Sequence, residues 1–220
     1  MRITYLGHSA FEIVSGESTI LIDPYLICSP GYNFRNVTNI FLTHGHGDHL
    51  GNSINISKAT GAEITAVFEL ANYCAKFGVN TRGINLGGWI KFPFGKVIFV
   101  PAFHSSSTPD GVYAGCASGI IFEIEGKRIF HTGDTSLNAE MKVIKEAYKP
   151  DVVMLPIGGT YTMDVENAAI ASEWIGANTV IPMHYNTFDA INADVEEFKN
   201  LILQQGKNPQ IMKPNDSIEL

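Results

Sequence analysis

The chain has 220 residues, 45% of them hydrophobic and 17% charged, and a formal net charge of −7 at pH 7. This length and composition are typical of a globular protein with one sizeable core, so we expect a single domain over residues 1–220. The acidic balance without any Lys/Arg run argues against a nucleic-acid partner, and no apolar stretch reaches the roughly 20 residues of a membrane span, which argues against a membrane partner.

Short apolar runs separated by polar turns open the chain and predict strands over residues 2–6, 10–14, 19–22 and 40–42, the first three as a β-meander. Helical patterns follow at about 50–60 and 69–77, with Gly61 and Gly78 as C-terminal stops. Further strands are expected at 96–103, 118–125 and 127–132, the last two as a hairpin that turns near Gly126.

The last third of the chain alternates helical and extended patterns. We expect helices at 137–148, 165–176 and 193–205, and strands at 152–155, 180–182 and 210–212. Strands and helices in both halves predict the α/β class, and composition alone leaves several α/β layouts open. No linker, low-complexity tract or repeat divides the sequence.

The run His44-Gly45-His46-Gly47-Asp48-His49 carries three of the seven histidines and one carboxylate within six residues. It follows the apolar run 40–42 and precedes a helical pattern, so it is expected to form a strand-to-helix loop. Its two glycines accept backbone angles that other residues avoid, which lets the loop turn its side chains toward one small volume. Imidazole and carboxylate groups suit zinc, iron, manganese, cobalt or nickel, and four of them can serve one ion or two.

This run resembles the His-x-His-x-Asp-His signature of the metallo-β-lactamase superfamily of hydrolases, and the other motifs of that superfamily occur in order. They are Asp23 in Leu-Ile-Asp-Pro, His104 in Val-Pro-Ala-Phe-His, Asp134 in Phe-His-Thr-Gly-Asp-Thr and His184 in Ile-Pro-Met-His-Tyr. The match covers nearly the whole chain. The short length, the Gly-His-Ser opening and the Leu-Pro-Ile-Gly-Gly segment are similar to small metal-dependent hydrolases of the superfamily, and ascorbate-phosphate lactonases are similar relatives.

The resemblance implies a four-layer αββα sandwich, in which two mixed β-sheets pack together, helices flank them outside, and the motif loops meet at one edge. It also implies two divalent metal ions per chain, with zinc as first choice and manganese, iron, cobalt or nickel as alternatives. The implied ligands are His44, His46 and His104 for the first ion, Asp48, His49 and His184 for the second, and Asp134 as the bridge.

The implied reaction is hydrolysis of a small ester, lactone or related substrate by a metal-bound hydroxide. A substrate that carries a phosphate group is included. No serine or cysteine nucleophile is required, and catalytic roles fall to Asp48 and His8. Two alternatives stay open: a phosphodiesterase or nuclease of the same superfamily, and a non-catalytic metal-binding sensor. The missing basic run argues against the first alternative, and the complete ligand set argues against the second.

Three further residues lie beside these motifs. In the superfamily pattern the residue at Asp23 orients a ligand histidine. His131, three residues before Asp134, is grouped with Asp23 as a supporting residue, and a hydrogen-bonded structural role and a catalytic role are equally open. His8 is outside the superfamily's ligand set, and substrate contact or proton transfer stands against a purely structural role.

The segment 158–164 joins an expected strand to a helix whose N-cap is Thr162 or Asp164. Because free N–H groups and hydroxyls at a helix N-terminus favour anions, Thr160, Tyr161 and Thr162 are candidate contacts for a phosphate or carboxylate on the substrate. The hydroxyl-rich run 105–108 after His104 is interpreted as a solvated loop.

Cys28, Cys74 and Cys116 are an odd number without metal or redox spacing, which favours core packing in a reducing compartment over a disulfide framework. The first residues begin a strand pattern directly and show no signal-peptide pattern. We therefore expect a cytoplasmic protein with a small-molecule substrate, and a homo-oligomer remains open.

Overall fold

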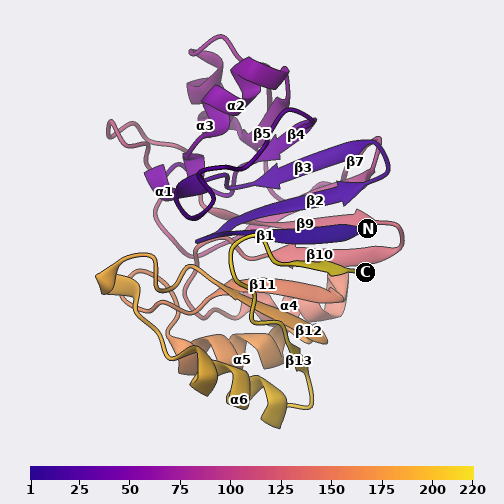
Figure 1. Cartoon of the computed structure of the whole chain (residues 1–220), viewed down its shortest axis with the longest axis vertical. Helices are drawn as coiled ribbons and strands as arrows, with labels where there is room; N and C mark the ends of the chain where they lie inside the picture. The colour runs from indigo at the N-terminus through magenta and orange to yellow at the C-terminus, as the bar shows by residue number, and fades with distance from the viewer.

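The computed structural model describes all residues 1–220 and shows two β-sheets packed face to face with helices outside (Figure 1). The first sheet has the strand order β14-β1-β2-β3-β4-β5-β6, and the second has the order β13-β12-β11-β10-β9-β8-β7. The strands of the first sheet are β1 Arg2–Gly7, β2 Ala10–Ser15, β3 Ser18–Ile22, β4 Asn39–Phe41, β5 Glu63–Val67, β6 Thr81–Ile84 and β14 Ser217–Glu219. Those of the second are β7 Ile90–Phe92, β8 Gly95–Pro101, β9 Ser118–Ile124, β10 Lys127–His131, β11 Val152–Pro156, β12 Thr179–Met183 and β13 Asn208–Pro209.

Helices cover the outer face of each sheet, apart from the single-turn helix α1 Gly47–Leu50, which lies at one edge of the sandwich (Figure 1). The others are α2 Ser53–Thr60, α3 Phe68–Ala75, α4 Glu140–Tyr148, α5 Val165–Ile175 and α6 Val195–Gln204, with 3-10 turns at Leu26–Cys28 and Asp189–Ile191. Helices α2 and α3 contact β5, whereas α5 contacts β11 and lies between α4 and α6 (Figure 1). The expected αββα sandwich is confirmed. None of the six α-helices combines the length and apolarity that crossing a bilayer requires.

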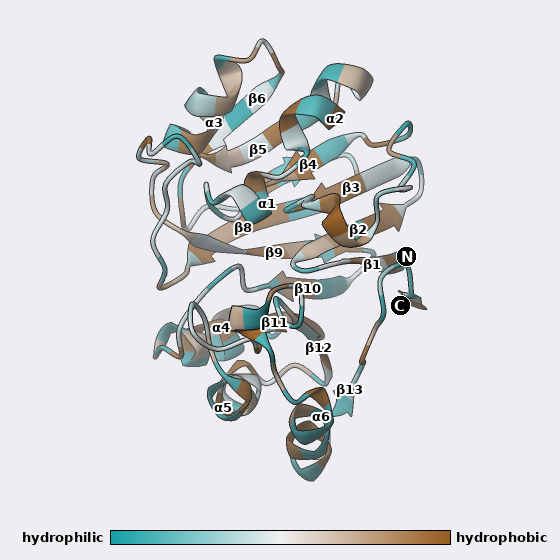
Figure 2. Ribbon diagram, turned by 60° about the vertical axis from the view of Figure 1, so that its left-hand side comes forward, coloured by the Kyte–Doolittle hydropathy of each residue, from teal (hydrophilic) through white to brown (hydrophobic).

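Two apolar layers hold the sandwich together, and β11 contributes to both. Val152 and Met154 belong to the cluster between the sheets, whereas Val153 and Leu155 belong to the cluster under the helices. Because successive side chains of a strand point to opposite faces, a strand buried on both faces needs an apolar residue at every position. Figure 2 shows this concentration of apolar residues along the strands.

The topology brings the sequence motifs to one edge of the sandwich. The motif residues follow the C-terminal ends of six strands, namely β1 (His8), β3 (Asp23), β4 (His44 to His49), β8 (His104), β10 (Asp134) and β12 (His184). In the first sheet β1 and β3 are both antiparallel to β2, and β4 is parallel to β3, so all three run in the same direction. In the second sheet β8 and β10 are both antiparallel to β9, and β12 is parallel to β10 through β11, so these three also share one direction. Their carboxyl ends therefore gather at a single edge.

Hydrogen bonds across this edge join the two sheets. The backbone N–H of His184 donates to the carbonyl of His8 at 2.8 Å, and that of Ser118 donates to the carbonyl of Thr43 at 3.1 Å. Loops from opposite sheets are thus fixed to each other where the motif side chains meet.

Most predicted elements are found within one or two residues of their expected bounds, and the hairpin turns at Gly126 as predicted. The single helix expected at 50–60 is instead divided into α1 and α2, because Gly51 has a φ of 44° and lies against the Pro24 carbonyl. The strand expected at 210–212 is wrong, since the pairing occurs at β13. Strands β5, β6, β7 and β14 were not predicted: β5 is a short apolar run between helices, and the others are short strands defined by their pairing partners.

Candidate metal centre

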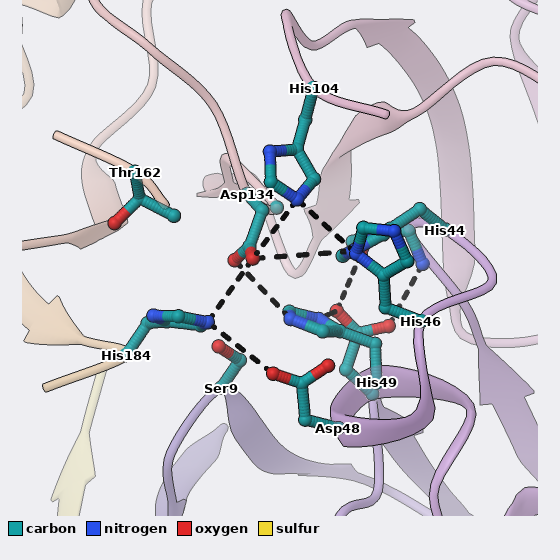
Figure 3. Close-up of polar contacts among 12 residues, drawn as sticks. Ser9, His44, His46, Asp48, His49, His104, Asp134, Thr162 and His184 are labelled. Atoms are coloured by element: carbon teal, nitrogen blue, oxygen red, sulfur yellow. Dashed lines mark hydrogen bonds and ion pairs between the residues drawn. The ribbon is translucent and has the colours of Figure 1, made fainter. Parts of the chain in front are cut away.

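Three histidine rings meet beyond the C-terminal ends of β4 and β8 (Figure 3). His44 and His46 lie between β4 and α1, and His104 follows β8. His44 Nε2 and His104 Nε2 lie 3.0 and 3.3 Å from His46 Nδ1. Three ring nitrogens from two sheets therefore face one small volume.

A second group forms beside the first. Asp48 and His49 lie in α1, and His184 follows β12. The Nε2 atom of His184 lies 3.6 Å from Asp48 Oδ2, and the rings of His49 and His184 are nearly parallel, with centroids 5.7 Å apart. One turn of helix and one loop from the other sheet thus supply a carboxylate and two imidazoles.

The Asp134 carboxylate lies between the two groups. Its Oδ1 is 3.3 Å from His49 Nε2, while its Oδ2 is 3.1 Å from His184 Nε2 and 3.6 Å from His104 Nε2. The preceding Gly133 has a φ of 62°, and a Cβ there would lie 2.5 Å from the Ser118 carbonyl oxygen. Only glycine fits this turn, which carries the carboxylate to its central position.

The donor set fits divalent metal ions. Two ligand atoms on a tetrahedral zinc ion, each about 2.0–2.1 Å from it, are themselves about 3.3 Å apart. The neighbouring donor atoms here are 3.0 to 4.0 Å apart. His49 Nε2 and Asp134 Oδ1 are buried and make no hydrogen bond, although they lie 3.3 Å from each other. Because buried polar atoms normally have partners, a cation shared by these two atoms accounts for their arrangement.

Asp23 decides which ring nitrogens face the centre. Its Oδ2 accepts hydrogen bonds from His49 Nδ1 at 2.7 Å and from the Thr43 hydroxyl at 2.6 Å. Since the Thr43 proton is used in this way, Thr43 Oγ1 accepts a hydrogen bond from His44 Nδ1 at 3.0 Å. Both histidines are thereby assigned the tautomer with an unprotonated Nε2, which metal coordination needs.

The two groups differ in electrostatics. Burial lowers the pKa of His44 well below its usual range, and neighbouring His49 adds to this effect. Burial also acts to lower the pKa of His49, but Asp134 and Asp23 outweigh it and raise that pKa well above its usual range. Burial would raise the pKa of Asp48, yet hydrogen bonds from His184 and His8 hold it well below its usual range. The carboxylate side therefore favours positive charge, whether a proton or a metal ion.

Backbone strain is concentrated at the same place. His8, Asp23 and His184 have φ values of 56°, 44° and 54°, in the left-handed region that non-glycine residues rarely occupy. Such residues cost on the order of 1–3 kcal/mol each and persist where the surroundings hold them, most often at functional sites. Here the hydrogen bond between His184 and His8 ties two of these turns together.

His8 touches the centre without belonging to the expected ligand set. Its ring is buried, with Nε2 3.2 Å from Asp48 Oδ2 and Nδ1 3.0 Å from the Thr187 hydroxyl. The neighbouring Ser9 hydroxyl is buried without a hydrogen-bond partner, and Figure 3 shows Ser9 between His184 and Asp48. Sequence reasoning did not single out Ser9, which has no motif beyond its position after His8.

His131 supports the turn that carries Asp134. Its Nε2 donates to the Ser9 carbonyl at 2.9 Å, and its Nδ1 accepts from the Gly133 N–H at 3.1 Å. Both ring nitrogens are therefore used by backbone groups, so His131 acts on the backbone around Asp134.

The segment 105–114 packs over the loop that carries His44 and His46. Within the run 105–108 only Ser105 is exposed, so the interpretation as a solvated loop is wrong for residues 106–108. The Ser106 hydroxyl accepts a hydrogen bond from the Gly45 N–H at 3.2 Å, and a Cβ on Gly45 would lie 2.5 Å from that of Ala114. The Ser105 hydroxyl lies 3.5 Å from His46 Nε2. The hydroxyl run directly after His104 was the available signal, but its partner could not be deduced from sequence.

The expected anion-binding loop has a different arrangement. The Thr160 hydroxyl donates to the Ala190 carbonyl at 2.8 Å, and Tyr161 is exposed. Thr162 lies on the His184 side of the centre in Figure 3, and its hydroxyl bonds only the Met163 carbonyl. The N-cap of α5 is Asp164, whose carboxylate accepts from the Asn167 N–H, so a negative charge already occupies this helix N-terminus.

Comparisons with known proteins agree with this geometry. The model of the β-lactamase superfamily domain matches residues 2–184. A UPF0173 metal-dependent hydrolase of Geobacillus thermodenitrificans is 46% identical over 228 aligned residues that cover 100% of both chains. The structure of Igni18, a metallo hydrolase of the archaeon Ignicoccus hospitalis, has a TM-score of 0.90 and 36% identity over 99% of this chain and 97% of that chain. YhfI of Bacillus subtilis shares the metallo-β-lactamase fold, with a TM-score of 0.78 and 14% identity over 99% of each chain.

The hydrogen bonds of Thr43 predict a specific effect on metal binding. Replacing Thr43 by Val removes the hydroxyl that links His44 to Asp23, so zinc affinity should fall about 10–100-fold, as is typical when the partner of a ligand histidine is lost. Thr43→Ser keeps the hydroxyl and should bind zinc as the unmodified chain does. Competition with a chelator measures both variants, and equal affinities for Val and Ser would show that this link does not orient His44.

Proposed function

We propose that this chain holds two divalent metal ions and hydrolyses a small ester or lactone. The chain belongs to the β-lactamase superfamily and is a metal-dependent hydrolase. The observation that carries the proposal is the position of the Asp134 carboxylate, with one oxygen toward His49 and the other toward His104 and His184. A carboxylate can offer one oxygen to each of two cations and offset their mutual repulsion.

The chain's residues divide into two sets around this bridge. His44 Nε2, His46 Nδ1 and His104 Nε2 would hold one ion, and Asp48, His49 and His184 would hold the other. Zinc suits the nitrogen-rich donors, with manganese, iron, cobalt or nickel as alternatives. When bound, such a pair of ions supplies Lewis acidity and a water of lowered pKa, which is the chemistry of two-metal hydrolytic sites.

His8 and Asp48 would handle a proton during the reaction. Burial lowers the pKa of His8, although the hydrogen bond with Asp48 acts in the opposite direction, so the ring is neutral near pH 7. Its Nε2 faces Asp48 Oδ2 and can release or accept a proton there. The Thr187 hydroxyl at Nδ1 holds the ring in this orientation.

A panel of substrates tests the reaction class. Protein reconstituted with zinc or manganese should hydrolyse lactones or carboxylic esters faster than phosphodiesters, thioesters or β-lactams. Cleavage of phosphodiesters alone would favour the nuclease alternative, and full metal loading without any turnover would favour a sensor.

Removal of the Asp134 carboxylate should abolish both metal content and activity. In Asp134→Ala the two sets lose the group that joins them, so metal per chain, measured by plasma emission spectroscopy, should fall together with ester hydrolysis. Asp189→Ala removes an exposed carboxylate from the loop after His184 and serves as the control. A variant at Asp134 that keeps a full metal complement would contradict the bridging role.

His8→Asn should separate proton transfer from structure. Asparagine keeps a hydrogen-bonding amide but cannot take up a proton in the neutral range, so turnover should fall about 10²–10⁴-fold, the usual contribution of a general acid or base. Metal content should stay unchanged, and the pH profile should lose the limb that the imidazole controls. Normal turnover with reduced thermal stability would assign His8 a structural role instead.

A further inference from the structure

The loops that carry the candidate metal ligands contain no lysine or arginine. None of the fifteen lysines and arginines lies within residues 42–53, 101–117, 131–139, 156–165 or 183–194. Outside these loops, Lys213 lines a cavity of about 200 Å³ together with His8 and Thr187, but without any of the candidate ligands. An anionic group on a substrate would therefore find no lysine or arginine on the loops that carry the candidate ligands.

Acidic groups line the cavity beside the loop where an anion was expected. A cavity of about 380 Å³ beside Gly158 and Gly159 is lined by the carboxylates of Asp164, Glu166, Asp194 and Glu197. Asp164 and Asp194 also cap α5 and α6, so both helix N-termini are already satisfied. The carboxylates that line this cavity would repel an anionic group of a substrate.

Aromatic side chains lie beside His8, next to the candidate metal centre. Tyr25 and Phe188 flank His8, each with a ring centroid 5.6 Å from that of His8, and their own centroids are 6.4 Å apart. We call these two rings the aromatic wall. Phe188 is 42% exposed although it is a large apolar side chain, and His8 connects the wall to Asp48. Three more exposed aromatic residues lie on the same loops, at Phe103, Tyr113 and Tyr161.

We propose that the substrate is an uncharged molecule with an apolar or aromatic group, and that this group packs on the aromatic wall with Phe188 determining specificity. The proposal rests on the hydrolase function above and narrows its substrate class. The ester or lactone carbonyl would face the metal ions, and the apolar group would cover Phe188, whose exposed ring gains most from removal of water. A phosphorylated or carboxylated substrate is disfavoured by the same surface.

Three acetate esters test the charge and the ring separately. They are methyl para-acetoxybenzoate, which is neutral and aromatic, para-acetoxybenzoate, which is its anionic counterpart, and methyl acetate, which lacks the ring. After each kcat/KM is divided by the rate of hydroxide-catalysed hydrolysis, the neutral aromatic ester should exceed the anionic one by at least about tenfold, the scale on which pocket contacts discriminate. Equal or faster hydrolysis of the anion would overturn the proposal.

Phe188→Ala should raise KM for the neutral aromatic ester about tenfold and leave methyl acetate and the metal content unchanged. Phe77→Ala is the matched control, because Phe77 is also 42% exposed and packs on a tyrosine, Tyr73, at the end of α3. Equal KM values in the two variants would remove Phe188 from substrate recognition.

A binding measurement keeps this inference separate from the hydrolase function. Fluorine NMR of the metal-loaded protein should show line broadening of para-fluorobenzyl alcohol that Phe188→Ala abolishes and Phe77→Ala preserves. The anion para-fluorobenzenesulfonate, a weak metal ligand, should not broaden. Broadening that depends on Phe188, without hydrolysis of any ester, would support the aromatic wall and refute the ester hydrolase. Hydrolysis without this dependence would refute the wall alone.

Discussion

The buried carboxylate of Asp134 is the group on which the rest of the centre depends. A carboxylate with almost no exposure is costly unless positive charge compensates it, and its neighbours within 4 Å are imidazole nitrogens of His44, His49, His104 and His184. Asp23 holds the Nδ1 proton of His49 on the opposite side of that ring, so the space between His49 Nε2 and Asp134 Oδ1 is left for a cation. The raised pKa of His49 shows that this position favours positive charge, whether a proton or a metal ion, and the proposed metal ion would take the place of the proton.

The fold satisfies this requirement by directing strands of both sheets to one edge. Strands β4, β8, β10 and β12 each end just before a candidate ligand, and the backbone bond between His184 and His8 fixes loops of opposite sheets together. Strained turns at His8, Asp23 and His184 are the local cost of this convergence. The surroundings then set the chemistry: the loops that carry the candidate ligands have no lysine or arginine, and the aromatic wall supplies apolar contact. Together these features favour a neutral substrate over a phosphate.

Much of the fold and the candidate ligand set could be predicted because the relevant signals are local. The apolar runs before His44, His104, Asp134 and His184 mark strands, and the motifs occur in the order of the superfamily. What escaped prediction depends on contacts between distant segments. The packing of Ser106 and Ala114 on Gly45, the aromatic wall of Tyr25 and Phe188, and the burial of Ser9 are set by tertiary packing, which no periodicity encodes. The anion-binding interpretation of residues 160–162 relied on a helix N-terminus alone, and the cap by Asp164 removes its basis.

The proposed two-metal centre is tested most directly by anomalous diffraction from crystals of protein reconstituted with zinc. Data collected on both sides of the zinc absorption edge identify each ion by element and locate it independently of the protein phases. Two well-occupied peaks per chain are expected, one among His44, His46 and His104 and one among Asp48, His49 and His184, each in contact with a different oxygen of Asp134. A single peak at full zinc loading, or an Asp134 carboxylate turned away from the ions, would contradict the bridged pair.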